Sequence, residues 1–290
     1  MDWSDEGLDW PNRRFSRFVE VGALVWHVQE RGPKGEAPTI LLLHGSGATT
    51  HSMVGLMDAL CGDYHCFSLD LPGHGFSTRM RRPCPTLEGV AGALNRLLGQ
   101  EGIVPDFIVG HSAGAAIGVQ MLSELERVKA IVSINGAFYP FPGMAGHVFP
   151  AIAKLLFLNP FVPRAFSFAA QTFGQVESLI QSTGSKLDER GMDFYRRALA
   201  SPHHVEGTLS LMANWDLYPM AERLRQLPVP MLQIIGTEDG TIEPDASDET
   251  QKLVPQVERI LHEGRGHLVH EEVPQEVAGQ IAAFVERVAQ

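Results

Sequence analysis

The residue whose setting most clearly suggests chemistry is Ser112, in the motif Gly110-His-Ser-Ala-Gly114. The apolar run from Phe107 to Val109 precedes it and is typical of a buried strand, and the small residues that follow are spaced as in a helix. A serine at the tip of such a strand–turn–helix unit has a strained backbone and a hydroxyl that projects from the carboxyl edge of a sheet. The motif alone is weak evidence, since 29 of the 290 residues are glycine.

Two further residues could activate this serine, because a hydroxyl is a poor nucleophile until a base removes its proton and an acid orients that base. Asp239 follows an apolar run at 231–235, and His267 follows another at 257–261. The ends of parallel strands would place both at the same sheet edge as Ser112, in the chain order Ser, Asp, His that this kind of turn requires. We therefore predict Ser112 as nucleophile, His267 as base and Asp239 as orienting acid.

Three other residues near strand ends are weaker candidates for the acid. Asp70 belongs to a tight Pro-Gly-His-Gly turn, where bonding to local backbone is the simpler role. Asn135 is an amide and cannot balance the charge of an imidazolium, and the side chain of Glu238 should point away from that of its neighbour Asp239.

No metal or other cofactor is predicted. The residues that could be imagined as a metal cluster lack a recognised ligand spacing, and they are His262, His267, His270 and Glu271.

An acyl-transfer intermediate also needs two backbone donors for its oxyanion. The residue after the nucleophile, Ala113, would supply one N–H. The loop His44-Gly-Ser-Gly47, which follows the apolar strand 39–43, would supply the other from Ser46.

The bulk composition describes a soluble globular chain with 44% hydrophobic and 20% charged residues. A net charge of −11 argues against nucleic acid as a partner. No apolar run is long enough to span a membrane, and the acidic first residues do not resemble a secretory signal. The three cysteines, Cys61, Cys66 and Cys84, form no CxxC pair and are expected to be reduced, so we predict a cytoplasmic protein. The oligomeric state is not predicted.

Strand and helix signals alternate along most of the chain. Strands are expected near 18–21, 24–28, 39–43, 65–69, 107–109, 128–134, 231–235 and 257–261. Helices are expected near 51–60, from the Thr86 cap to about 98, after Ser112, and at 274–288. This alternation predicts the α/β class, with a mostly parallel, doubly wound sheet of about eight strands.

The interval 137–213 breaks that alternation. It has no strand signal, and its part from 138 to 173 contains eight of the fifteen phenylalanines, at positions 138, 141, 149, 157, 161, 166, 168 and 173. We predict a helical cap, or lid, inserted into a core formed by 1–136 and 214–290, with an apolar underside that binds a large hydrophobic or aromatic ligand. The predicted pocket residues are His44, Gly45, His111, Phe138, Phe141, Trp215 and Leu268.

Several short motifs are distributed along nearly the whole chain. They are His44-Gly-Ser-Gly47, Asp70-Leu-Pro-Gly-His-Gly-Phe-Ser77, Gly110-His-Ser-Ala-Gly114, Gly236-x-x-Asp239 and Gly266-His267. With these motifs the sequence resembles the α/β-hydrolase superfamily. More narrowly, it resembles the α/β-hydrolase-like magnesium chelatase accessory proteins of bacteriochlorophyll biosynthesis. The stretches that carry this closer resemblance include Asp9-Trp-Pro11, Thr183-Gly-Ser-x-Leu-Asp188 and Met212-Ala-x-Trp-Asp-Leu217.

The resemblance implies an α/β-hydrolase fold with an inserted lid, a role near magnesium insertion into a protoporphyrin ring, and association with magnesium chelatase. It does not imply a particular reaction. The apolar lid would suit a flat tetrapyrrole, its alkyl ester or an acyl chain.

Three functions therefore stay open at this point. The first is a serine hydrolase that acts on a carboxyl-ester-like bond of an apolar substrate. The second is a non-catalytic accessory or porphyrin-binding protein on the same fold. The third is a carbon–carbon bond hydrolase that uses the same three residues.

Overall fold

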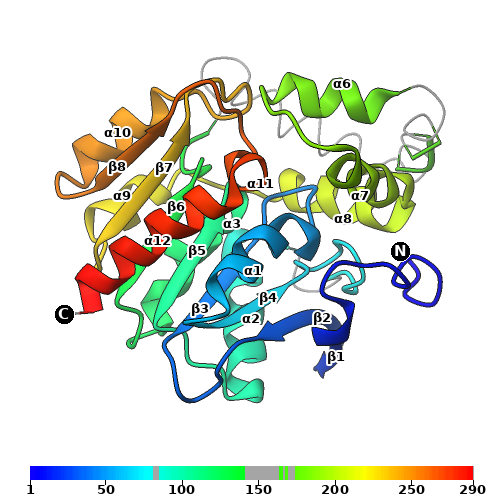
Figure 1. Cartoon of the computed structure of the whole chain (residues 1–290), viewed down its shortest axis with the longest axis horizontal. Coiled ribbons are helices and arrows are strands. Elements are labelled where there is room, and N and C mark those ends of the chain that lie inside the picture. The colour runs from blue at the N-terminus through cyan, green and yellow to red at the C-terminus, as the bar shows by residue number, and fades with distance from the viewer. Residues whose placement is uncertain (81–84, 141–162, 166, 169–173, 290) are drawn as a thin grey trace.

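The computed structural model describes residues 1–80, 85–140, 163–165, 167–168 and 174–289. An eight-stranded sheet runs through the molecule in the order β1-β2-β4-β3-β5-β6-β7-β8 (Figure 1). Strands β1 and β2 form an antiparallel hairpin, β2 also pairs antiparallel with β4, and every other pairing is parallel. The strands are β1 Ser16–Val21, β2 Leu24–Arg31, β3 Thr39–Leu43, β4 His65–Leu69, β5 Phe107–His111, β6 Ala130–Ile134, β7 Met231–Gly236 and β8 Glu258–His262.

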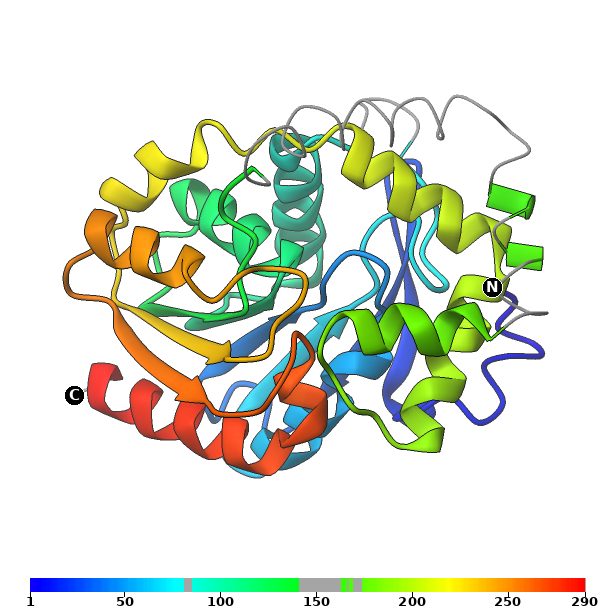
Figure 2. The same ribbon diagram turned by 90° about the horizontal axis from the view of Figure 1, so that it is seen from above.

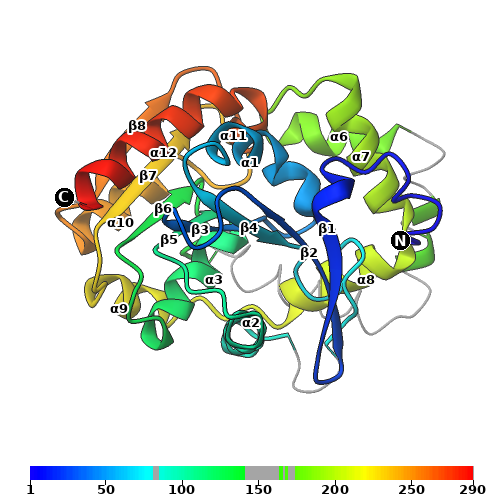
Figure 3. The ribbon, with the colours of Figure 1, turned by 60° about the horizontal axis from the view of Figure 1, so that its bottom comes forward.

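Helices cover both faces of the sheet, which explains why its inner strands are apolar without alternation. Figure 3 shows α1, α11 and α12 on one face and α2, α3 and α9 on the other. The core helices are α1 Val54–Leu60, α2 Leu87–Glu101, α3 Ala113–Met121, α9 Met220–Arg225, α10 Ala246–Leu253, α11 Val269–Glu272 and α12 Pro274–Ala289. Short 3-10 helices lie at η1 Arg13–Phe15, η2 Thr50–Met53 and η3 Leu122–Glu124.

The two faces bury separate hydrophobic clusters from alternate residues of the same strands. In β3, Leu41 and Leu43 pack toward α2 and α3, whereas Ile40 and Leu42 pack toward α1 and α12. Because successive side chains of a strand point to opposite faces, a continuous apolar run supplies both clusters. No helix in the described part of the chain is long and apolar enough to cross a bilayer.

Three more helices lie beyond the carboxyl ends of the parallel strands, and they are α6 Gln175–Ser182, α7 Glu189–Ala200 and α8 Pro202–Ala213 (Figure 2). They share a small hydrophobic cluster with Ala48 and Leu268, which belong to loops at that edge of the sheet. They are the described helices of the interval predicted as a lid. Residues 141–162, 166 and 169–173 of that interval lie outside the described residues, and so do Phe141, five of the other predicted phenylalanines and, elsewhere in the chain, Cys84.

The N-terminal segment is fastened at the junction between α7 and the core. The Trp10 side chain is 2% exposed and packs edge-on against Phe76 and Phe194, with ring centroids 4.9 and 5.2 Å away. Its indole N–H donates to the Thr50 hydroxyl over 3.2 Å. The stretch around Trp10, noted above only as a resemblance, therefore joins segments that are far apart in the sequence.

The predicted fold is confirmed. Each expected strand is present within two or three residues of its predicted ends, and the sheet is mostly parallel. The Thr86 side chain caps α2 by accepting from Gly89 N–H over 3.1 Å, as the sequence pattern indicates. The first expected helix differs slightly, because it begins as the 3-10 turn η2 before α1.

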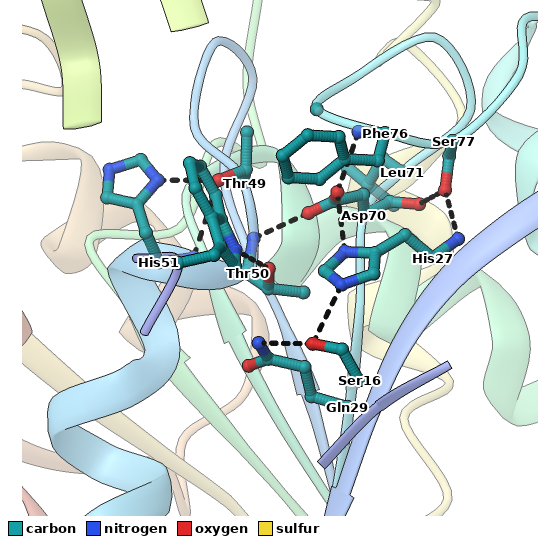
Figure 4. A network of polar contacts seen from close by, with 12 residues as sticks. Ser16, His27, Gln29, Thr49, Thr50, His51, Asp70, Leu71, Phe76 and Ser77 are labelled. Atoms are coloured by element: carbon teal, nitrogen blue, oxygen red, sulfur yellow. Dashed lines mark hydrogen bonds and ion pairs between the residues drawn. The ribbon is translucent and has the colours of Figure 1, made fainter. Parts of the chain in front are cut away.

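A buried charge with several partners is Asp70, at the carboxyl end of β4 (Figure 4). One of its oxygens contacts His27 Nδ1 at 2.8 Å and accepts from Phe76 N–H at 2.9 Å, and the other accepts from Thr50 N–H at 2.7 Å. Burial alone would raise the pKa of Asp70, but the facing His27 and these hydrogen bonds hold it well below its ordinary value. Asp70 thus joins β2, η2 and its own loop, which goes beyond the local role expected from the sequence.

The same network contains a serine. His27 Nε2 lies 3.0 Å from Ser16 Oγ, so Ser16, His27 and Asp70 follow one another in the order serine, imidazole, carboxylate (Figure 4). Ser16 Oγ also accepts from the Gln29 amide over 3.1 Å. The network joins the β1–β2 hairpin to the rest of the sheet.

Histidines form an unusual part of the interior. Burial holds the pKa of six buried histidines and of the half-buried His203 below the ordinary value, and the six are His44, His51, His74, His111, His204 and His270. For His51, His204 and His270 the pKa falls to about 3. The folded chain therefore keeps these imidazoles neutral.

Replacing Asp70 by Asn tests the buried carboxylate. The amide keeps the size of the side chain but removes the charge and turns an N–H group toward donors that need an acceptor. Loss of one partner from a buried ionic network typically costs about 3–5 kcal/mol, and we expect a decrease of this order in the free energy of unfolding in urea. The exposed Asp63→Asn should change it by less than about 0.5 kcal/mol. Equal stability of the two variants would contradict the assigned role.

The buried histidines predict a loss of stability in mild acid. The unfolded chain binds protons on these side chains below a pH of about 6.5, whereas the folded chain does not. Stability therefore falls as the pH drops from about 6.5 toward 3, because the unfolded state binds more protons. Glu271, whose pKa burial raises to about 8, opposes this with a single proton.

The measurement is the urea midpoint at pH 7.5 and pH 5.5, with proton uptake on unfolding obtained by calorimetry in two buffers. We expect a lower midpoint and a net uptake of protons at pH 5.5. Identical midpoints at the two pH values would contradict the assignment of neutral buried imidazoles.

Candidate active site

Ser112 occupies the turn between β5 and α3 in a conformation that few residues adopt. Its backbone angles are φ 50° and ψ −116°, which for a side chain other than glycine stores about 1–3 kcal/mol of strain. The turn closes because its neighbours lack side chains: a Cβ at Gly114 would overlap the Leu43 carbonyl, and one at Gly110 would collide with α3. Ser112 N–H donates to the Ile134 carbonyl over 2.9 Å, which ties the turn to β6.

Asp239 and His267 are brought together by the loops after β7 and β8. His267 Nδ1 lies 2.7 Å from Asp239 Oδ2, and the two residues are only 6% and 5% exposed. The other carboxylate oxygen, Oδ1, accepts from the N–H groups of Thr241 and Ile242 over 2.7 and 2.9 Å. The carboxylate is therefore oriented by its own loop, and an ionised Asp239 leaves Nδ1 as the protonated nitrogen of a neutral His267.

The other two acid candidates at this edge, Glu238 and Asn135, make no hydrogen bond to the His267 ring within the described part of the chain. Glu238 is exposed, as the sequence indicates for a residue adjacent to the buried Asp239. Asn135 sits in a left-handed conformation with φ 46°, and its amide bridges the ends of three segments. Its Nδ2 donates to the carbonyls of Gly266 and His267 over 3.1 and 2.9 Å, and its Oδ1 accepts from Gly236 N–H over 2.9 Å.

His111 adds a second brace to the same loop. Its Nε2 lies 3.0 Å from the His267 carbonyl, so this nitrogen carries the proton, and burial holds the pKa of His111 well below its ordinary value. The Glu272 carboxylate accepts from Gly266 N–H over 2.9 Å. Together with Asn135 these contacts place the backbone of His267 from several directions. Within the described ranges, no group of three or more His, Cys, Asp or Glu side chains could hold a metal ion.

The loop after β3 forms a tight turn directly against Ser112. Ala48 N–H donates to the Gly45 carbonyl over 3.2 Å, and Gly47 has φ 81°, so residues 45–48 form a four-residue turn. A Cβ on Gly45 would lie 3.1 Å from Ser112 Cβ and 2.7 Å from His111 Nδ1. No protein acceptor for the N–H of Ser46 or Ala113 is found among the described residues. We call residues 45–48 the oxyanion loop, after the role predicted for Ser46.

A cavity of about 580 Å³ opens between the strand ends and the helices α6–α8. Ser112 and His267 both line it, together with Ser46 and Ala113. The Ser112 hydroxyl makes no hydrogen bond to another described residue. None of the described lining residues is Asp, Glu, Lys or Arg. The site therefore combines a polar floor with uncharged, mostly apolar walls.

The predicted pocket residues separate into two groups. His111, Trp215 and Leu268 line the cavity. His44 is fully buried behind it, and its ring bridges Leu71 N–H and the Gly45 carbonyl at 2.9 and 2.7 Å. Gly45 packs behind Ser112, Phe138 is 1% exposed within the core, and Phe141 lies outside the described residues.

Sequence reasoning missed most of the cavity wall. Helix α8 lines it with Leu211 and with a face that contains Val205, Thr208, Leu209 and Met212. Their spacing of i, i+3, i+4 and i+7 is the pattern of one helix side and could have located this wall. The aromatic lining comes from Tyr139, Tyr195, Trp215 and Tyr218.

Comparison with known proteins identifies similar sequences. A family model described as "Alpha/beta hydrolase family" matches residues 40–280. A protein named magnesium-chelatase 30 kDa subunit, from Rhodobacter capsulatus, is 34% identical over 96% of this chain and 97% of its own length. A pimeloyl-[acyl-carrier protein] methyl ester esterase from Vibrio atlanticus is 25% identical over 84% of this chain and 91% of its own.

Solved structures show the same fold. The crystal structure of a putative lipase from Acinetobacter baumannii superposes with a TM-score of 0.79, at 19% identity, over 94% of this chain and 91% of the lipase chain. Haloalkane dehalogenase from Bradyrhizobium elkani superposes with a TM-score of 0.76, at 20% identity, over 94% of this chain and 98% of its own. Since the family model spans most of the sequence and the Rhodobacter protein aligns over nearly its whole length, the chain belongs to the alpha/beta hydrolase family.

Proposed function

We propose that the protein is a serine hydrolase that cleaves a carboxyl-ester-like bond of an apolar substrate. The observation that supports this most directly is that Ser112 and His267 line one cavity, while Asp239 Oδ2 lies 2.7 Å from Nδ1 of the His267 ring. In this proposal the interval 137–213, which includes α6–α8, acts as a cap over the cavity.

The proposed reaction uses each residue in a defined step. Asp239 keeps the proton of His267 on Nδ1, so Nε2 is free to take the proton from Ser112 as its oxygen attacks the ester carbonyl. The N–H groups of Ser46 and Ala113 bind the oxyanion that forms. The imidazolium then gives its proton to the departing alcohol, and a water activated by the same nitrogen releases the acid and regenerates Ser112.

The cavity walls support an uncharged substrate group. Burying an isolated carboxylate or ammonium without a partner is strongly unfavourable, and no described lining residue carries an opposite charge. An acyl chain or an aromatic ester would bury its apolar surface there, and aromatic side chains at the wall would pack against a flat ring. The relative named as a methyl ester esterase supports the choice of bond.

A second candidate function follows from the relative named as a chelatase subunit. The chain would then associate with magnesium chelatase and hold a tetrapyrrole or its ester in the same cavity, without using Ser112. The two functions are separable because only the first needs the serine hydroxyl.

Labelling with a fluorophosphonate probe tests the nucleophile. The probe phosphonylates serine oxygens that are activated and lie beside an oxyanion site, so wild type should label and Ser112→Ala should not. Ser112→Ala should also lose essentially all turnover of p-nitrophenyl butyrate. Ser16→Ala is a matched control, because it removes a hydroxyl from another serine–imidazole–carboxylate chain and should label like wild type.

Absence of labelling in folded wild type would overturn the hydrolase proposal. In that case, a titration with protoporphyrin and its dimethyl ester would test the second candidate, whose prediction is equal binding by wild type and Ser112→Ala. Labelling that persists in Ser112→Ala and disappears in Ser16→Ala would place the activated serine on β1.

Charge selectivity tests the substrate class. p-Nitrophenyl hexanoate and mono-p-nitrophenyl adipate have acyl chains of equal length, but the second carries a terminal carboxylate. Because that carboxylate would be buried without a charged partner, we expect kcat/KM to be at least about 100-fold lower for the adipate at pH 7.5. Similar values for the two esters would contradict an uncharged cavity as the acyl site.

A further inference from the structure

His204 links helix α8 to the oxyanion loop through a buried imidazole. Its side chain is fully buried, and it lies on the helix whose next residues line the cavity. His204 Nδ1 accepts from Gly75 N–H over 3.0 Å, and its Nε2 lies 3.0 Å from the Gly47 carbonyl. One ring thus joins the helix to two separate loops.

The two partners settle which nitrogen carries the proton. Gly75 N–H can only donate and the Gly47 carbonyl can only accept, so the ring is neutral with its proton on Nε2. Burial agrees with this state, since it lowers the pKa of His204 to about 3. A protonated ring would turn an N–H toward Gly75 N–H and lose that bond.

The Gly47 carbonyl belongs to the turn that carries Ser46 N–H. Within the described ranges, three hydrogen bonds hold this turn. Ala48 N–H donates to the Gly45 carbonyl over 3.2 Å, the His44 ring contacts the Gly45 carbonyl at 2.7 Å, and His204 contacts the Gly47 carbonyl. The His204 bond is the one that reaches the turn from helix α8. Gly47 has a positive φ of 81°. Because glycine adopts many backbone conformations, the turn could also take up conformations other than this one.

Helix α8 also packs directly against the loop that follows β4 and contains Gly75. A Cβ on Gly207 would overlap the Gly73 carbonyl, which shows that the two backbones are in contact. His203, the neighbour of His204, contacts the Ser77 carbonyl at 2.9 Å through Nε2. His203 therefore links the same helix to the same loop, but among the described residues it makes no hydrogen bond to the oxyanion loop.

We propose that His204 is a positioning residue, which holds the oxyanion loop in the conformation that places Ser46 N–H beside Ser112. Through it, the position of helix α8, whose cavity-lining face would contact a bound substrate, is coupled to stabilisation of the oxyanion. This inference rests on the proposed hydrolase function.

Two substitutions separate the bonds that the ring makes. In His204→Gln the amide nitrogen can reach the position of Nε2 and still donate to the Gly47 carbonyl. In His204→Asn the side chain reaches only as far as Nδ1, so it can accept from Gly75 N–H but cannot reach Gly47. A role in positioning the oxyanion loop predicts that Gln retains activity and Asn does not, whereas a role confined to holding the Gly75 loop predicts the reverse.

The measurement is kcat and KM with p-nitrophenyl butyrate, together with the rate of phosphonylation by the fluorophosphonate probe. Loss of an oxyanion donor costs about 10²–10³-fold in kcat, and a misplaced donor should cost somewhat less. We expect His204→Asn to lower kcat by about 10–100-fold and to slow phosphonylation equally, with KM changed by less than about threefold. His204→Gln should stay within about fivefold of wild type, and His203→Ala should match wild type.

Several results would overturn the inference. If wild type is active and folded His204→Asn has an unchanged kcat, His204 has no positioning role and the proposed function stands. A larger loss in His204→Gln than in His204→Asn assigns the residue to the Gly75 loop instead. A wild type that neither labels nor hydrolyses overturns both the proposed function and this inference.

A measurement on the wild-type chain covers the case in which His204→Asn does not fold. Phosphonylation of Ser112 fills the oxyanion site, so it should shift the ring N–H resonance of His204 in a ¹⁵N-edited spectrum and leave the ring resonances of His203 unchanged. A His204 resonance that does not move on phosphonylation overturns the proposal.

Discussion

The buried carboxylate of Asp70 is the constraint on which the loops at the carboxyl edge of the sheet depend. A charge removed from water must be met by several donors at once, and here they come from β2, η2 and the loop that follows β4. Few rearrangements of those segments would keep all three donors in place. Because η2 begins only two residues after the oxyanion loop, the carboxylate also limits where that loop can lie.

The strained turn at Ser112 depends on this surrounding rigidity. A residue other than glycine at φ 50° persists only where neighbouring structure leaves it no alternative. Here Gly45 and Gly114 allow the loops after β3 and β5 to approach within contact distance, and Asn135 ties the adjacent strand ends to the backbone of His267. The side chains at the site are thus held by backbone contacts between segments, with the cavity above them left open.

Much of the fold could be predicted because its signals are local. Apolar runs, the Thr86 cap and the glycines around Ser112 act within a few residues, so they can be read directly from the chain. The pairing of Asp239 with His267 was also accessible, since parallel strands bring their carboxyl ends to one edge. His204, Asn135 and the wider role of Asp70 were not, because their partners lie 20 to more than 150 residues away or act through backbone atoms that every residue has.

The sequence by itself determined the α/β class, the order of strands and helices, and the three residues that the edge of the sheet brings to one place. These follow from hydrophobic periodicity and from the geometry of parallel strands. Only the tertiary structure decided which histidines are neutral, which wall of the cavity α8 supplies and how the oxyanion loop is held. Burial and hydrogen bonding between distant segments set those properties, and neither is encoded in the spacing of neighbouring residues.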